Sequence, residues 1–172
     1  MVAASIAGTD LTRVQALPDP LDAANEILIQ AGHQVDFGAQ VTQIIRLAGG
    51  TPVAIGAVNS VSADQLLGAI TPRTAAFLFV QSHHAVQKGA LSLERCIEMC
   101  AAHQIPVLVD AAAEEDIERF TTSGADLVTF SGGKAIGGPT SGIGRPMNAP
   151  DRASSWPSSI PLPSPASAWA TS

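Results

Sequence analysis

Three side chains with ionisable or hydroxyl groups follow the ends of two consecutive apolar runs. Asp110 follows the run at residues 106–109, and both Ser131 and Lys134 follow the run at residues 127–130, in the motif Ser-Gly-Gly-Lys. Short β-branched runs bounded by turn residues are typical of strands in a buried parallel sheet. Because ligands of such sheets bind at the carboxyl ends of the strands, the sequence predicts that Asp110 and Lys134 lie at the same edge.

A carboxylate and a lysine at one sheet edge suit the chemistry of pyridoxal phosphate. A lysine can form a Schiff base with the aldehyde of this cofactor if its surroundings keep it partly unprotonated. A carboxylate against the ring nitrogen keeps the ring protonated, so that the ring accepts electrons from carbanions formed on the substrate. The Ser131 hydroxyl and the N–H groups of the glycines after it could bind the phosphate. The alternative is that Asp110 caps the next helix and that Lys134 is a solvated surface lysine.

Two segments, DAAAEE and GADLVTFSGGKAIGGPTSGI, resemble the selenocysteine synthase-like branch of the fold-type-I pyridoxal phosphate enzymes. The likeness is greatest to its members of the D-glucosaminate-6-phosphate ammonia-lyase type, and it extends from about residue 1 to residue 143. The resemblance implies that Lys134 carries the cofactor, that Asp110 pairs with the pyridine nitrogen and that Ser131 helps to bind the phosphate. Ser-x-x-Lys alone would be a weak signal, because unrelated nucleophilic-serine enzymes share it.

Two further predicted strands end at histidines. His33 follows the run at residues 26–30, and His83 and His84 follow the run at residues 75–80. The resemblance implies that an aromatic group stacks on the cofactor ring from about this point of the fold, and His33 is the candidate for that role. It also places one of the paired histidines, for which we take His84, near the phenolic oxygen of the cofactor or in proton transfer. A structural His33 and a solvent-exposed histidine pair are the alternatives. We expect no metal site, because adjacent positions point in different directions and have no partner one helical turn away.

Composition narrows the class of protein. A chain of 172 residues with 46% hydrophobic residues is long enough for one domain with a core. The net charge of −6, without a basic block, argues against a general nucleic-acid surface. Cys96 and Cys100 lie on a predicted helix at residues 92–103, and we interpret them as core thiols in a reducing compartment. Without a basic leader or a long apolar span, we expect a cytoplasmic protein with no membrane segment.

The order of elements predicts an α/β fold with a mainly parallel sheet of about five strands and helices on both faces. A further strand is expected at residues 51–58, and a capping box at Ser62 and Gln65 begins the helix after it. As the resemblance implies, residues 1–143 would be a partial large domain of a fold-type-I pyridoxal phosphate-dependent transferase. Residues 144–172, crowded with proline and serine, would be a disordered or loosely packed tail outside the family.

The resemblance implies a pyridoxal phosphate-dependent lyase that eliminates ammonia or another leaving group from an amino-sugar acid or an amino acid. The partners would be this small-molecule substrate and further copies of the chain in a homodimer or higher homo-oligomer. One alternative is an enzyme similar to L-seryl-tRNA(Sec) selenium transferase. Another is an inactive remnant or non-catalytic partner subunit, because the family's Ser/Gly/Ala-rich phosphate loop does not precede the first predicted helix. A change of reading frame near Gly144 would explain the change of composition there. A plain Rossmann nucleotide binder is disfavoured by the lack of a GxGxxG motif.

Overall fold

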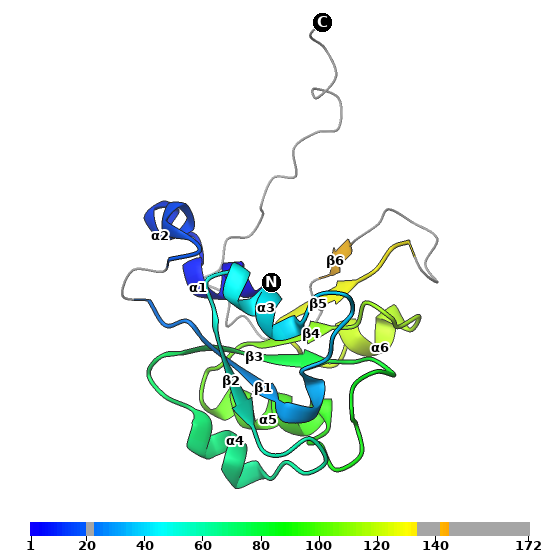
Figure 1. Ribbon diagram of the computed structural model, residues 1–172. Coiled ribbons are helices and arrows are strands. Elements are labelled where there is room, and N and C mark those ends of the chain that lie inside the picture. Colours follow the sequence, from blue (N-terminus) through cyan, green and yellow to red (C-terminus); the bar gives the residue numbers. More distant parts are fainter. Residues whose placement is uncertain (20–22, 134–141, 145–172) are drawn as a thin grey trace, which may run out of the picture.

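The computed structural model describes residues 1–19, 23–133 and, for the backbone alone, 142–144. These parts form one sheet in the strand order β2-β1-β3-β4-β5-β6 (Figure 1). The first five strands in the chain run parallel, and β6 pairs antiparallel with β5. The strands are β1 (Glu26–Gln30), β2 (Thr51–Ile55), β3 (Thr74–Val80), β4 (Val107–Asp110), β5 (Leu127–Phe130) and β6 (Gly142–Gly144).

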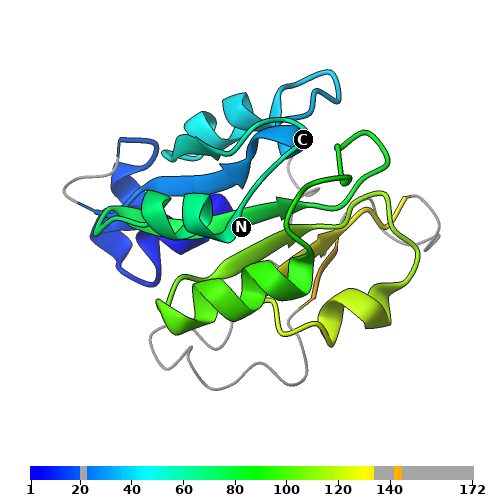
Figure 2. The ribbon, with the colours of Figure 1, turned by 90° about the horizontal axis from the view of Figure 1, so that it is seen from below.

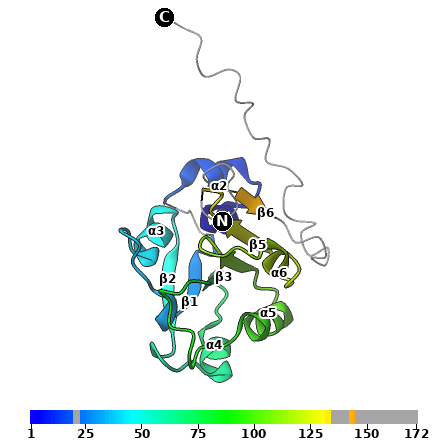
Figure 3. The same ribbon diagram turned by 90° about the vertical axis from the view of Figure 1, so that its right-hand side faces the viewer.

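Helices cover both faces of the sheet, as the sequence predicts. They are α1 (Val2–Ala7), α2 (Leu11–Ala16), α3 (Val41–Leu47), α4 (Ala63–Ala69), α5 (Leu93–Ala102) and α6 (Ile117–Thr121), with a short 3-10 helix η1 (Ala31–His33) after β1. Figure 3 shows α3 on one side of the sheet and α5 and α6 on the other, and Figure 2 shows the same layers from below. The predicted capping box is present, since the Ser62 hydroxyl accepts from the N–H of Gln65 and the Gln65 side chain accepts from the N–H of Ser62.

Successive side chains of a strand point to opposite faces of the sheet, so the core consists of two clusters, one on each face. On β1, Leu28 packs with the α4, α5 and α6 side, whereas Ile27 and Ile29 pack with α1 and α3. Every residue of β3 is buried, which is the pattern of a central strand covered on both faces. Within the described residues, no helix is long and apolar enough to cross a membrane.

The sheet changes its winding direction between β1 and β3. The chain leaves β1 through α3 to reach β2 on one side, and it leaves β3 through α5 to reach β4 on the other. The two strands are in register up to the pair Ile29 and Leu78. Because their connections then lead to opposite sides, a crevice opens at the carboxyl ends of β1 and β3, and such a switch point is where open α/β sheets bind ligands.

The structure corrects two details of the expected fold. The strand expected at residues 51–58 ends at Ile55, because Gly56 has a φ of +67° and Ala57 and Ser60 close a tight turn. The antiparallel strand β6 was not expected, because three residues around Ile143 are too short a run to be recognised as a strand. Of the tail predicted at residues 144–172, Gly144 is the last residue of β6, and residues 145–172 lie outside the described residues.

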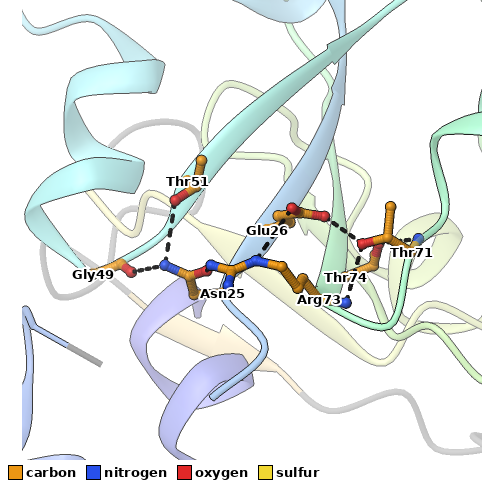
Figure 4. A network of polar contacts seen from close by, with 7 residues as sticks. All are labelled: Asn25, Glu26, Gly49, Thr51, Thr71, Arg73 and Thr74. Carbon is orange, nitrogen blue, oxygen red and sulfur yellow. Dashed lines mark hydrogen bonds and ion pairs between the residues drawn. The ribbon is translucent and has the colours of Figure 1, made fainter. Parts of the chain in front are cut away.

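A polar network joins the opposite, amino-terminal edge of the sheet (Figure 4). The Arg73 guanidinium donates to the side-chain oxygen of Asn25 at 2.9 Å and pairs with the Glu26 carboxylate at 3.4 Å. The Asn25 amide donates to the carbonyl of Gly49 at 3.2 Å and to the Thr51 hydroxyl at 3.3 Å. The starts of β1, β2 and β3 are therefore held together by side chains at the edge that lies away from the crevice.

Candidate functional site

A hollow of about 250 Å³ lies at the carboxyl edge of the sheet, at the switch point. Its size is slightly below the ~300–1,000 Å³ of most small-molecule sites. The walls come from the ends of β3 and β4, the loops that follow them, and the loop after η1. The lining residues are Phe37, Val80, Gln81, Ser82, His83, His84, Asp110, Ala112 and Ala113. The hollow therefore lies where the sequence predicted a ligand edge.

Asp110 is the last residue of β4, and backbone contacts on both sides hold it in place. It is in register with Val80 on β3 and with Thr129 on β5, and its carbonyl accepts from the N–H of Gln81 at 2.8 Å. Its side-chain oxygen Oδ1 accepts from the N–H of Ala112 at 3.1 Å, which orients the carboxylate at the start of the loop. A carboxylate held in this way can accept a hydrogen bond from a protonated ring nitrogen of a ligand.

The segment Ser131–Gly133 begins on the neighbouring strand, directly beyond β5. Because Asp110 is in register with Thr129, Ser131 lies two residues further along the same edge. Its side chain is partly exposed, whereas Gly132 is buried. Asp110 and the start of the Ser-Gly-Gly-Lys motif thus share one edge, as expected from the strand ends. Lys134 follows Gly133 directly and lies outside the described residues, and Ser131 is not one of the residues that line the hollow.

Two neighbouring histidines and a phenylalanine form the aromatic part of the lining. The ring centroids of His83 and His84 lie 3.9 Å apart at an angle of 42°, and the Phe37 ring meets His84 edge-on at 5.6 Å. The His84 N–H donates to the hydroxyl of the buried Ser82 at 3.2 Å, which fixes the turn from which both rings project. Exposed imidazoles beside a hollow can bind polar groups of a ligand and can transfer protons.

His33 lies in the interior next to this site. Its side chain is fully buried, its Nδ1 accepts from the N–H of Val80 at 3.2 Å, and its ring meets Phe79 edge-on at 4.6 Å. Burial lowers the pKa of His33 to about 4, a shift that the nearby Gln87 side chain opposes. The ring is therefore neutral at pH 7, with its proton on Nε2. That buried nitrogen makes no hydrogen bond with any described residue.

The predicted site residues therefore take different places. Asp110 and His84 line the hollow, Ser131 lies beside it, and His33 lies behind it with no exposed surface. The roles given to these residues remain predictions, and the stacking role of His33 has no support from its buried position.

Sequence reasoning missed Phe37 and the small residues Ala112 and Ala113, which also line the hollow. An aromatic residue in a loop that follows a strand end would have been a signal for Phe37. Among the described residues, no group of three or more His, Cys, Asp or Glu side chains could hold a metal ion.

Comparison with known proteins identifies relatives of this chain. The family model described as L-seryl-tRNA selenium transferase matches residues 14–145. The D-glucosaminate-6-phosphate ammonia lyase of Salmonella typhimurium is 49% identical over 142 residues, which are 83% of this chain and 38% of that protein. The 5'-C-glycyluridine monooxygenase-decarboxylase of a Streptomyces species is 48% identical over 144 residues, 83% of this chain and 36% of that protein. An L-seryl-tRNA(Sec) selenium transferase of Geotalea uraniireducens is 28% identical over 159 residues, 82% of this chain and 34% of that protein.

Solved structures of similar fold include a relative of the same kind. A structure of D-glucosaminate-6-phosphate ammonia-lyase superposes with a TM-score of 0.80 at 49% identity, covering 84% of this chain and 40% of that one. An alanine aminotransferase from Pyrococcus furiosus, with a TM-score of 0.50 and 19% identity over 88% of this chain and 39% of that one, shares the fold alone. The chain thus spans two fifths or less of the length of these relatives. It belongs to the L-seryl-tRNA selenium transferase family, with the α/β fold of the fold-type-I pyridoxal phosphate enzymes.

Proposed function

We propose that this protein is a pyridoxal phosphate-dependent enzyme that eliminates ammonia or another leaving group from an amino-sugar acid or an amino acid. The observation that carries the proposal is the position of Asp110 at the hollow, on the strand next to the start of the Ser-Gly-Gly-Lys segment. The 49% identity to an ammonia lyase supports the type of reaction.

The residues at this edge fit the cofactor by their chemistry. The Asp110 carboxylate would accept the hydrogen bond of the ring nitrogen and keep the proton on that nitrogen. Ser131 and the N–H groups after it would donate to the phosphate oxygens. When bound, pyridoxal phosphate withdraws electrons from the substrate carbon that loses its proton. Lys134 would hold the cofactor covalently through Nζ and then move the proton of the substrate carbon.

The histidine pair would contribute to the part of the site that receives the substrate. His83 and His84 are exposed and line the hollow together with Asp110. We assign to His84 a contact with the phenolic oxygen of the cofactor or a proton transfer, and to His83 a contact with a polar group of the substrate. The aromatic edge of Phe37 would limit the width of that group.

Two relatives with nearly equal identity carry different printed activities, an ammonia lyase at 49% and a glycyluridine monooxygenase-decarboxylase at 48%. The substrate screen therefore includes amino-sugar acids, amino acids and nucleosides that carry an amino-acid group. A reaction on seryl-tRNA is the second candidate, supported by the family match. The net charge of −6 and the lower identity of 28% count against it.

Cofactor attachment is the first test, because only two lysines, Lys88 and Lys134, are available. The purified chain is mixed with pyridoxal phosphate, its visible absorption is recorded, and borohydride reduction followed by peptide mass mapping locates the modified lysine. The wild type and Lys88→Ala, in which an exposed lysine is removed, should both show the absorption of bound cofactor. Lys134→Ala should lose it. Absorption that survives Lys134→Ala, or mass added at Lys88 alone, would contradict the proposal.

We also propose that the protein acts as a homodimer or higher homo-oligomer in the cytoplasm. The cytoplasmic assignment is supported by Cys96 and Cys100, which lie four residues apart on α5 as free, buried thiols rather than a disulfide. Light scattering during size-exclusion chromatography tests the oligomeric state, and a monomer at all concentrations would contradict it.

A further inference from the structure

We propose that Gln30, His33 and Gln87 are positioning residues that hold the loop at residues 81–92 in the shape that brings Ser82, His83 and His84 to the hollow. The inference rests on the proposed function only in taking this hollow as the substrate site. It concerns three side chains that do not line the hollow, and it gives His33 a role other than the stacking that the resemblance implies.

The need for such residues arises from the switch point. Beyond the pair Ile29 and Leu78, β1 and β3 no longer share a hydrogen-bond ladder, because they diverge there. The side of Val80 that faces β1, and the end of the loop at Leu91, therefore have backbone groups without a strand partner. Buried backbone groups without hydrogen bonds destabilise the fold, so side chains must take the place of the missing strand.

Gln30 makes two hydrogen bonds to such backbone groups. Its side-chain oxygen accepts from the N–H of Leu91 at 2.8 Å, and its side-chain nitrogen donates to the carbonyl of the same residue at 3.1 Å. The glutamine is fully buried at the end of β1, a position where an apolar residue would ordinarily be found. The paired bonds thus imitate a strand neighbour and attach the far end of the loop to β1.

His33 and Gln87 do the same for Val80, the residue from which the loop departs. His33 Nδ1 accepts from the N–H of Val80 at 3.2 Å, and the Gln87 side chain donates to the carbonyl of Val80 at 3.3 Å. The three side chains together satisfy the N–H and C=O of both Val80 and Leu91. Side-chain bonds therefore hold Val80, the residue before the loop, and Leu91, near its end, whereas Gln81 donates to the carbonyl of Asp110 on β4.

Close backbone contacts hold the middle of the loop. The N–H of Val86 donates to the carbonyl of Gly32 at 2.9 Å, and a Cβ on Gly32 would lie 2.4 Å from the carbonyl oxygen of Val58. Gly89, at a φ of +83°, accepts from the N–H of Val61 at 2.9 Å, and a Cβ there would lie 2.0 Å from the carbonyl oxygen of Asn59. Only glycine permits these approaches. The lining residues Ser82, His83 and His84 lie between the attachments at Val80 and Val86, so their positions depend on the shape of the loop.

Imidazole NMR on the full chain tests the inference without any catalysed reaction. The protein has four histidines, so that each ring can be assigned. In Gln30→Leu, the signals of His83 and His84 should shift, and the amide of Leu91 should exchange about tenfold faster, since it loses its acceptor. His103, at the C-terminal end of α5, should keep its signal. The control Gln43→Leu makes the same change at an exposed position of α3 and should leave all four signals unchanged.

Unchanged signals of His83 and His84 in a folded Gln30→Leu protein would overturn the inference. If Gln30→Leu does not fold, Gln87→Ala takes its place, since Gln87 is exposed and its removal breaks the bond to the Val80 carbonyl and the interaction with His33. The same two histidine signals should then move, and their constancy would again overturn it.

Kinetics separates this inference from the proposed function. Gln30→Leu should bind pyridoxal phosphate at Lys134 as the wild type does, but its kcat/KM should fall about ten- to a hundredfold, because a displaced loop misplaces the substrate. A wild type that binds no cofactor would contradict the proposed function while the NMR result stands. Equal kcat/KM in Gln30→Leu and Gln43→Leu would overturn the positioning role alone.

Discussion

At the scale of single residues, Asp110 combines two tasks in one carboxylate. Oδ1 accepts from the N–H of Ala112, and the group as a whole lines the hollow. The first task needs only an oxygen acceptor, whereas the second, under the proposed function, needs a negative charge opposite a protonated ring. A substitution that keeps the oxygen and removes the charge can therefore separate structure from chemistry.

We expect Asp110→Asn to lower kcat/KM by about a hundred- to a thousandfold, the effect of removing one group that stabilises charge in a site. The free energy of unfolding should change by less than about 1 kcal/mol, because the amide oxygen can still accept from Ala112. Steady-state kinetics and urea unfolding measure the two quantities. Asp64→Asn, at an exposed position in the first turn of α4, is the matched control. Wild-type activity in Asp110→Asn would refute the assigned role.

His33 should make the stability depend on pH. Its pKa in the folded protein is about 4, below the usual 6.5, so between these values the unfolded chain binds a proton that the folded chain does not. The free energy of unfolding should therefore fall as the pH drops from about 6.5 to 4, by up to ~3 kcal/mol from this residue. Above pH 6.5, where His33 is neutral in both states, the residue should not make the free energy of unfolding depend on pH.

Urea unfolding between pH 4 and pH 7 measures this slope. The variant His33→Gln should show a shallower fall than the wild type, because the residue that takes up the proton on unfolding is gone. His103→Gln, at an exposed position at the end of α5, should keep the wild-type slope. Identical slopes in the wild type and His33→Gln would show that His33 is not buried as a neutral ring.

At the scale of elements, the two edges of the sheet have different tasks. The amino-terminal edge is closed by the network of Asn25, Arg73 and Glu26, which joins the starts of β1, β2 and β3 (Figure 4). The carboxyl edge instead carries the hollow. In α/β folds the first kind of edge serves stability and the second serves binding.

We expect Asn25→Ala to lower the free energy of unfolding by about 1–2 kcal/mol, because it removes three side-chain hydrogen bonds at a partly buried position. Cofactor binding should stay as in the wild type, since the change lies at the other edge. Urea unfolding and a pyridoxal phosphate titration measure the two effects, and Asn59→Ala in an exposed turn is the control. Weakened cofactor binding without lost stability would contradict this division.

At the scale of the whole molecule, ligand binding at the hollow and the stability of the folded protein depend on each other. The ends of β3 and β4 and the loops that follow them line the hollow. These segments come together only in the folded protein, so the unfolded chain has no such site. A ligand that binds only the folded protein stabilises it by mass action.

Pyridoxal phosphate should therefore raise the free energy of unfolding, by about 2.7 kcal/mol at a free concentration one hundred times its Kd. Thermal unfolding with and without the cofactor measures the effect. Lys88→Ala should respond as the wild type does, and Lys134→Ala should respond much less. Pyridoxal, which lacks the phosphate, should stabilise less because it does not reach the donors after Ser131. An equal response of the two lysine variants would place the binding elsewhere.

The sequence alone predicted the five parallel strands and the polar groups at their ends, although it missed β6 and the end of β2. β1 has the expected bounds, Asp110 stands at the carboxyl end of β4 as its last residue, and Ser131 follows β5. These features are local, because an apolar run bounded by turn residues carries its own signal. The resemblance added the family and the expected cofactor, which the comparisons confirmed at the level of the family.

Only the tertiary structure decided which of these polar groups meet. The bonds between Gln30 and Leu91 join residues 61 positions apart, and no local pattern marks them. They exist because β1 lies between β2 and β3, so that β1 and β3 diverge at their carboxyl ends and leave backbone groups for side chains to satisfy. His33 is buried with its Nδ1 on the N–H of Val80, which fits the structural alternative for this residue, whereas the resemblance implied a ring stacked on the cofactor. Strand order depends on packing across the whole sheet, and for that reason it was beyond the reach of spacing along the chain.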